Sequence, residues 1–432
     1  MAASDDGALL AITGGRVVTV TAATIDGGAV IIEGGRIRAV GAGLRVPTGA
    51  RVFDASGMWV MPGLIDSHSH LGLLGDPGVW ANDELNEATE PVTAHLRGQD
   101  GFNPDDPALA EAVKAGITAA FTGPGSANVI GGTGFAFKLR GGTLAEMAIA
   151  GSEAMKMALG ENPKRLHGQS SAKRSPATRM GNAAVLREAL VKAQNHAARL
   201  KWREGQVGGA RTGTDGAGST GAVVEPEPVG RDLGLEALGR VVGGQMRARI
   251  HAHRADDILT ALRIAEEFGL DAVIEHCTEG YKVAAEVARR GVMCTVGPFF
   301  SDRTKMELKD ERLSNAAALV RAGVRVALQM DGAAQTAFLP LCAGVAVREG
   351  MPEEDALRAV TINAAAVIGA ADRLGSLEPG KDADIAIFDG HPFCTFTRCM
   401  ATIIDGVVVW ERPPASAGGA YRRPSPAHTI ER

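Results

Sequence analysis

The chain has 432 residues, of which 45% are hydrophobic and 22% charged, and its formal net charge is -5 at pH 7. This charge leaves no broad basic face, which argues against a nucleic-acid partner. No stretch approaches the ~20 apolar residues that cross a bilayer, and the N-terminus lacks the pattern of a signal peptide. The five cysteines form no CxxC pair. We therefore expect a cytoplasmic protein without a membrane partner.

Both ends of the chain are rich in short strand-like segments. Residues 1–60 alternate apolar runs with Gly-Gly and Asp-Gly pairs, which are typical of strands joined by tight turns. Similar apolar runs return in residues 376–412. We therefore predict one small β-sandwich domain that is assembled from residues 1–60 and 376–412.

The middle of the chain, residues 61–375, alternates eight apolar strand-like runs with helical segments. This alternation favours parallel strands, and eight of them favour a closed barrel. The predicted fold class is therefore α/β, a (β/α)8 TIM barrel joined to the small β-sandwich. Residues 204–231 are rich in Gly, Thr and Pro and are predicted to form a flexible insertion loop. The tail, residues 413–432, is predicted to be disordered.

Histidines stand at the C-terminal ends of three predicted strands. His68 and His70 end the first strand, His251 and His253 the fifth, and His276 the sixth. Side chains two residues apart on a strand share a face, and strand ends in a barrel form a ring. Imidazole is a common ligand of divalent metals. The pattern therefore predicts a metal site at the mouth of the barrel.

Asp331 ends the eighth predicted strand. A carboxylate at this position can ligate a metal ion, and it can also take a proton from the water that the ion activates. We therefore predict that Asp331 is a catalytic residue, which carries this proton to a leaving nitrogen.

Four segments carry a family resemblance, namely VMPGLIDSHSH, HAHRADDI, IEHC and GSLEPGKDAD. They resemble the metal-dependent amidohydrolase superfamily, and in particular its imidazolonepropionase-like and prolidase-like members. The resemblance extends from about Ile12 to Trp410. It implies an enzyme that cleaves a C–N bond other than an ordinary peptide bond, in an amide, a cyclic amide or imide, or a dipeptide-like small molecule. The alternatives are deamination of a ring amidine and a non-catalytic barrel scaffold.

Within this resemblance, His68, His70 and His276 match metal ligands, and Asp331 matches the catalytic aspartate, which is also a candidate ligand. The family implies one or two divalent ions. Zinc is expected because the predicted ligands are rich in histidine, with iron or manganese as alternatives. Family habit also implies a homo-oligomer.

Two ligand positions stay open at this point. On the fifth strand, His251 fits the ligand position better, and His253 would face the same cavity as a catalytic, substrate-contacting residue. The bridging ligand of the fourth strand is either Lys156, which would have to be carboxylated, or Glu161, whose carboxylate could bridge directly.

Two polar loops are predicted to contact the substrate. One follows the first strand, and its Arg97 is suited to gripping a carboxylate. The other has the sequence GPGSANVIGG. The candidate substrate-binding residues are Glu90, His95, Arg97 and Asp100 in the first loop and Ser126 and Asn128 in the second. An ordinary solvated loop is the alternative interpretation of the first.

One feature departs from the family pattern. The related sequences often follow the eighth-strand aspartate with His-Pro, whereas this chain has Gly332 and Ala333 after Asp331. A polar group beside the catalytic carboxylate is therefore missing, which indicates an altered substrate or altered chemistry.

Overall fold

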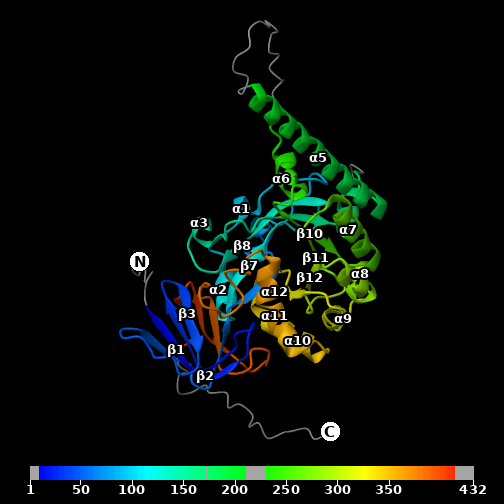
Figure 1. Cartoon of the computed structure of the whole chain (residues 1–432). Coiled ribbons are helices and arrows are strands. Elements are labelled where there is room, and N and C mark those ends of the chain that lie inside the picture. Colours follow the sequence, from blue (N-terminus) through cyan, green and yellow to red (C-terminus); the bar gives the residue numbers. More distant parts are fainter. Residues whose placement is uncertain (1–8, 171–173, 211–229, 414–432) are drawn as a thin grey trace.

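The computed structural model describes residues 9–170, 174–210 and 230–413 (Figure 1). Within these ranges, the chain forms two eight-stranded sheets. One sheet is the barrel, and helices cover its outer side. The other is built from strands near the two ends of the chain. No helix in the described ranges is long and apolar enough to cross a membrane.

The barrel sheet contains the eight strands that the sequence predicted, in sequence order from β6 to β13. The backbone N–H of Asp331, just after the last strand, donates to the carbonyl of His68 in the first at 3.1 Å, so the barrel is nearly closed. The strands are β6 (Leu64–Ser69), β7 (Ile117–Thr122), β8 (Ile130–Lys138), β9 (Ala154–Ala158), β10 (Arg247–Ala252), β11 (Ala272–His276), β12 (Met293–Val296) and β13 (Val326–Leu328).

The prediction that all eight strands are parallel is wrong for β8, which runs antiparallel to both β7 and β9. The segment between β7 and β8, residues 123–129, contains no helix. A parallel connection needs a crossover of a dozen or more residues, whereas a short loop can only return the chain in the opposite direction. The reversal brings Lys138, at the end of β8, to the base of the barrel.

Helices follow most of the strands. The longer ones are α2 (Pro107–Lys114), α4 (Glu161–Gly168), α5 (Arg179–Ala210), α6 (Leu233–Val242), α7 (Ala255–Phe268), α8 (Ala284–Arg289), α9 (Asn315–Arg321), α10 (Leu339–Arg348), α11 (Glu353–Ala359) and α12 (Ile362–Val367). Two single-turn helices, α1 (Gly98–Gly101) and α3 (Leu144–Met147), lie beside β8 and before β9.

Helix α5 is 32 residues long and extends well beyond the barrel in Figure 1. Because it continues to Ala210, the prediction of a flexible loop beginning at residue 204 is wrong at its start. The rest of that predicted loop falls mostly on residues 211–229, which lie outside the described residues. The predicted tail likewise lies outside them from residue 414 onward.

The second sheet joins strands from both ends of the chain. Its strands are β1 (Leu10–Val17), β2 (Ile25–Glu33), β3 (Arg36–Gly41), β4 (Arg51–Asp54), β5 (Trp59–Pro62), β14 (Ile385–Phe388), β15 (Cys399–Ile404) and β16 (Val407–Glu411). The two ends meet where β14 pairs with β5 in antiparallel register. The sandwich form and the boundaries at residues 1–60 and 376–412 stay predictions.

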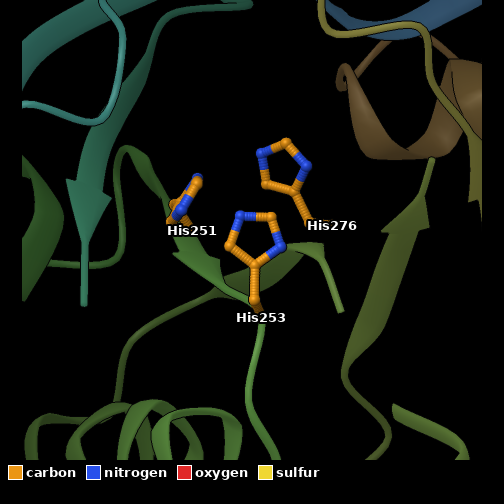
Figure 2. Close-up of side chains that lie close together, drawn as sticks. All are labelled: His251, His253 and His276. Carbon is orange, nitrogen blue, oxygen red and sulfur yellow. The ribbon is translucent and has the colours of Figure 1, made fainter. Parts of the chain in front are cut away.

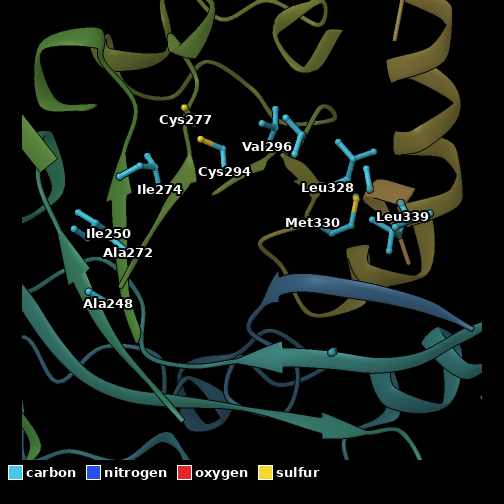
Figure 3. Packing of buried hydrophobic residues seen from close by; sticks show 14 of the residues in the cluster. Ala248, Ile250, Ala272, Ile274, Cys277, Cys294, Val296, Leu328, Met330 and Leu339 are labelled. Carbon is cyan, nitrogen blue, oxygen red and sulfur yellow. The ribbon is translucent and has the colours of Figure 1, made fainter. Parts of the chain in front are cut away.

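Alternation along the barrel strands separates the hydrophobic core from the barrel interior. On β10, Ala248 and Ile250 belong to the core that the strands share with the helices (Figure 3). The residues that alternate with them, Arg249 and His251, face the opposite side, because successive side chains on a strand point to opposite faces. The guanidinium of Arg249 lies over the ring of Phe121, 3.8 Å from its centroid. The interior of the barrel therefore receives the polar side chains.

Candidate metal centre

Two groups of side chains at the C-terminal ends of the barrel strands could each hold a metal ion. Within each group, one ligand atom from every residue lies within 4.8 Å of the others. The aspartate group consists of His68, His70 and Asp331, and the histidine group consists of His251, His253 and His276. Figure 2 shows the three rings of the histidine group turned toward one another.

A single carboxylate oxygen connects the two groups. Oδ1 of Asp331 lies 3.1 Å from Nε2 of His68 and 3.4 Å from Nε2 of His70. The same oxygen lies 3.6 Å from Nε2 of His276, which belongs to the histidine group. Three imidazole nitrogens and a carboxylate therefore converge on one point, and this donor set suits a divalent transition metal.

His251 provides the clearest test of whether a metal fits. Both of its ring nitrogens are buried and have no hydrogen-bond partner among the described residues. A buried polar atom without a partner costs free energy, and such atoms are rare in native proteins. Its ring centroid lies 4.5 Å from those of His253 and His276. A metal ion bound here would give this imidazole the partner that the protein does not.

His253 differs from His251 because both of its ring nitrogens have partners. Nδ1 lies 2.7 Å from the hydroxyl of Thr278, and Nε2 lies 3.2 Å from Nζ of Lys305. The hydrogen bonding therefore favours His251 as a ligand and leaves His253 to contact other groups in the same cavity.

Strained backbone conformations orient the side chains of two site residues, His276 and Asp331. Glu275 faces the barrel interior, so regular alternation along β11 would turn His276 outward. Instead, His276 has a φ of 65° and Cys277 a φ of 46°, and Asp331 also lies in this left-handed region with a φ of 61°. Non-glycine residues rarely adopt this conformation, and it is concentrated at functional sites. The strain turns the imidazole of His276 back toward Asp331.

Burial favours the neutral form of four histidines of the site. It lowers the pKa of His276 to about 4, and it lowers that of His70. The pKa values of His251 and His253 lie well below the usual range, mainly through burial and partly through neighbouring positive charges that include Lys305. Because only the neutral imidazole binds a metal, these side chains are ready to act as ligands near neutral pH.

Asp331 is held in its ionised form. Burial would raise the pKa of this carboxyl, but its interactions with the imidazoles of His276, His68 and His70 outweigh burial and hold the pKa well below the usual range. The carboxylate is therefore available both as a ligand and as a proton acceptor.

The two candidates for the fourth-strand ligand are placed differently. Nζ of Lys156, on β9, lies 3.4 Å from Nε2 of His68 and is ion-paired with Glu275. Glu161 instead begins α4, where its carboxylate accepts the backbone N–H of Glu307 at 3.3 Å. Within the described residues Glu161 belongs to neither group. The geometry therefore favours Lys156.

A buried charge network, which the sequence motifs did not reveal, lies beneath the aspartate group. Glu275 accepts a hydrogen bond from Nε of Arg249 at 2.6 Å and is ion-paired with Lys156. Its Oε1 also lies 3.1 Å from Nδ1 of His68. Strand alternation could have revealed Arg249, because it lies two residues before His251 and must share its face. Alternation along one strand could not have shown that Glu275 is the partner of Arg249, because the two residues lie on different strands.

Asp66 was also missed, although it lies in the same motif as His68. Its carboxylate accepts the backbone N–H groups of His68 and Met330, both at 3.2 Å, and the hydroxyl of Thr336 at 3.0 Å. Burial raises the pKa of Asp66 to about 7. The side chain ties the first barrel strand to the segment that follows the last, and so it fixes the position of His68 relative to Asp331.

The structure does not bring the predicted residues of the first polar loop to the two groups. Arg97 and Asp100 are both 62% exposed, and the guanidinium donates two hydrogen bonds to Asp100 at 2.9 and 2.7 Å. Glu90 is ion-paired with Arg174. His95 lines cavities beside α5 and α6 whose linings include no member of either group. The interpretation of an ordinary solvated loop fits Arg97 and Asp100 better.

The predicted residues of the second loop hold that loop in place. Asn128 is buried, and its amide group donates to the carbonyl of Glu87 and the hydroxyl of Thr93, both at 2.8 Å. Its carbonyl oxygen lies 3.0 Å from Nε2 of His167. Ser126 accepts a hydrogen bond from Asn162 at 2.7 Å. The polar atoms of Asn128 are therefore already engaged within the protein.

The chain is similar in sequence to proteins of known families. The model of the amidohydrolase family matches residues 59–409. Amidohydrolase tasK of Hapsidospora irregularis is 30% identical over 385 residues, which is 85% of this chain and 38% of that protein. Imidazolonepropionase of Geobacillus kaustophilus is 37% identical over 162 residues, or 36% of this chain and 35% of that protein. The matches thus span well under two thirds of the length of either relative.

Solved structures show the same likeness. An amidohydrolase from Thermotoga maritima is 38% identical, with a TM-score of 0.85 over 93% of this chain and 100% of that one. A prolidase solved with N-methylphosphonate-L-proline has a TM-score of 0.51 and 18% identity, over 94% of this chain and 100% of that one. At that identity, the second comparison bears on the fold alone.

Proposed function

The chain belongs to the amidohydrolase family, and from this premise we propose that it is a metal-dependent hydrolase of small molecules. The bond cleaved is the C–N bond of an amide, a cyclic amide or imide, or a dipeptide-like compound. The observation that carries the proposal is the convergence of three buried imidazoles on Asp331, together with the nitrogens of His251, which have no partner among the described residues.

The aspartate group and the histidine group would hold one or two divalent ions, with zinc preferred because imidazole nitrogens dominate the donor set. A divalent ion in this position supplies activation of water and polarisation of the scissile carbonyl. Lys156, once carboxylated by carbon dioxide, would be the anionic bridging ligand, since its Nζ already lies beside His68.

Three histidines are oriented by groups behind them. Nδ1 of His70 lies 2.9 Å from the carbonyl of Gly123, and Nδ1 of His276 lies 3.1 Å from that of Gly297. Nδ1 of His68 faces the carboxylate of Glu275. An acceptor at Nδ1 places the proton there and leaves the lone pair on Nε2, which points to the site. This arrangement favours the tautomer that a ligand needs at His70. Nδ1 of His276 also lies 3.1 Å from the amide nitrogen of Gln329, and Nδ1 of His68 makes no hydrogen bond within the described residues.

Asp331 would accept a proton from the attacking water and deliver it to the departing nitrogen. Its backbone N–H is bound to the carbonyl of His68, and its Oδ1 faces three imidazoles, so the carboxylate is held at the centre of the site. Its depressed pKa keeps it ionised and able to accept this proton near neutral pH.

The variant Asp331→Asn tests the proposal, because it removes the proton acceptor and keeps the shape of the side chain. We expect turnover to fall by about 10²- to 10⁴-fold, while elemental analysis still finds metal in the folded protein. Substrates would be N-acyl amino acids, cyclic imides and X-Pro dipeptides, with the exposed Asp105→Asn as the matched control. Wild-type activity in Asp331→Asn, or no metal bound after reconstitution of the wild type, would contradict the proposal.

The same panel distinguishes the alternative chemistry. Adding ring amidines and measuring free ammonia would reveal a deaminase. A metal-loaded protein that releases ammonia from ring amidines and hydrolyses none of the amides would replace the proposed function by the deaminase alternative.

A further inference from the structure

Lys305 brings a positive charge to the histidine group from a distant part of the chain. It lies on the loop after β12, directly before the short helix η3 (Met306–Leu308). Its Nζ lies 3.2 Å from Nε2 of His253. Its charge adds to burial in lowering the pKa of each histidine of this group, so the ammonium lies within electrostatic range of all three.

Two fixed groups hold this ammonium in place. On one side is His253, whose other nitrogen is bound to Thr278. On the other is Glu307, whose Oε1 lies 3.3 Å from Nζ of Lys305 and whose Oε2 accepts the backbone N–H of Glu161 at 2.8 Å. Glu307 is fully buried, so it cannot follow Lys305 into solvent. The lysine is therefore oriented before any ligand arrives.

The ammonium has capacity left for a ligand. It carries three N–H donors, and the two groups that hold it engage at most two of them. The Lys305 side chain is 20% exposed, whereas His253 and Glu307 are 5% and 0% exposed. Lys305 is thus the accessible member of the three, and its remaining donor can reach a bound molecule.

A cavity nearby is lined by further basic side chains. Beyond Glu307 lies a polar cavity of about 400 Å³, and four of its ten lining residues are basic against two that are acidic. The basic residues are Lys164, Arg165, Arg179 and Arg254. Of these, Arg179 and Arg254 are ion-paired with Asp257 and Asp256. The ammonium of Lys305 keeps a donor for a ligand, so it is the group that a substrate carboxylate would meet.

We propose that Lys305 is a specificity-determining residue, which binds a carboxylate group of the substrate and makes the enzyme select amides that carry one. The inference rests on the proposed hydrolase function and adds the substrate class to it. The neutral Nε2 of His253 and the carboxylate of Glu307 act as positioning groups for Lys305.

A charge-removal series tests this role on the metal-loaded enzyme. The variants are Lys305→Met and Lys305→Arg, with Lys309→Met as the matched control, because Lys309 is exposed on the same segment. One measurement is hydrolysis of the matched pairs N-acetyl-L-leucine with its carboxamide and hydantoin-5-acetate with its carboxamide. The other is calorimetric binding of succinate and of its neutral diamide, which needs no turnover.

We expect Lys305→Met to raise KM about 10- to 100-fold for the carboxylate member of each pair, and far less for the neutral member. Succinate binding should weaken by a similar factor, Lys305→Arg should retain part of the affinity, and Lys309→Met should match the wild type. Binding of the diamide should be the same in all variants.

Two other results would overturn the inference, and a third would separate it from the proposed function. Equal succinate binding by the wild type and Lys305→Met would overturn the inference. An equal fall in kcat for both members of a pair would also overturn it, because Lys305 would then act on the reacting bond. Lys305-dependent succinate binding by a protein that hydrolyses no amide of the panel would uphold the anion site and contradict the proposed function.

Discussion

The two ends of the barrel both bury charged groups, but they do so in opposite ways. At the base, the ammonium of Lys138 donates to Asp382 at 2.9 Å and to Asp384 at 3.0 Å, and it is also ion-paired with Asp405. At the mouth, neither ring nitrogen of His251 has a partner within the part of the chain that the structure describes. Burial of polar groups is common to structure and function. His251 differs because neither of its polar atoms has a partner among the described residues, whereas at the base Oδ2 of Asp384 lacks one but the other oxygen of that carboxylate accepts from Lys138.

The base cluster also joins the two sheets. Lys138 ends β8 of the barrel, whereas Asp384 directly precedes β14 and Asp405 lies in the turn between β15 and β16. Because β8 runs antiparallel to its neighbours, its C-terminal residue arrives at the base and not at the mouth. The same residue at the end of a parallel strand would have joined the metal centre. Strand direction therefore decides which of the two roles this lysine has.

The largest expected effect is a loss of metal binding when a histidine at the mouth of the barrel is replaced. Replacing His251 by Ala removes an unpartnered donor, and we expect metal affinity and turnover each to fall by more than about 100-fold, since loss of a mere supporting partner already costs 10- to 100-fold. Elemental analysis after dialysis measures the loss. His196, a buried histidine of α5 outside both groups, gives the control His196→Ala. Full metal content in His251→Ala would contradict the ligand assignment.

At the base, Lys138→Met should act on stability alone. It leaves buried carboxylates without their cation, and breaking a buried ion pair from one side costs about 3–5 kcal/mol. Denaturant unfolding measures the change, and metal content per folded chain should stay at the wild-type value. The control Lys114→Met removes an exposed lysine that is ion-paired with Glu111, and it should change stability by less than about 1 kcal/mol. Loss of metal in Lys138→Met would contradict the view that the base of the barrel serves stability and the mouth binds metal.

An intermediate effect is expected from the network under the aspartate group. Glu275→Gln keeps the shape of the side chain but removes the charge that faces His68 and is shared with Lys156 and Arg249. Supporting partners of this kind are worth about 10- to 100-fold in metal affinity or activity. Zinc titration of the apo protein measures it, with the exposed Glu267→Gln as the control. An unchanged affinity would show that Glu275 serves stability only, like the cluster at the base.

The smallest effect concerns Arg97. Because its exposed pair with Asp100 is far more solvated than either buried cluster, Arg97→Ala should leave stability close to that of the wild type. Turnover and KM should stay within about twofold of the wild type, measured with whichever substrate the panel identifies. A tenfold rise in KM would instead return this arginine to the substrate-binding role that the sequence suggested.

The sequence by itself determined the elements of the site that follow from local rules. Eight apolar runs predicted eight barrel strands, and residues at their ends, such as His68, His251 and Asp331, could be placed at one mouth because strand ends in a barrel form a ring. Alternation along a strand placed neighbours such as His70 on a shared face. These rules depend only on spacing along the chain, so a single sequence is enough to apply them.

Only the tertiary structure decided how those residues are partnered. The direction of β8 follows from a short connection and sends Lys138 to the base. Left-handed backbone turns His276 inward against the alternation of its own strand. Lys305 meets His253 although 52 residues separate them in sequence. Pairing between distant residues depends on packing of the whole chain, which no local pattern of the sequence encodes.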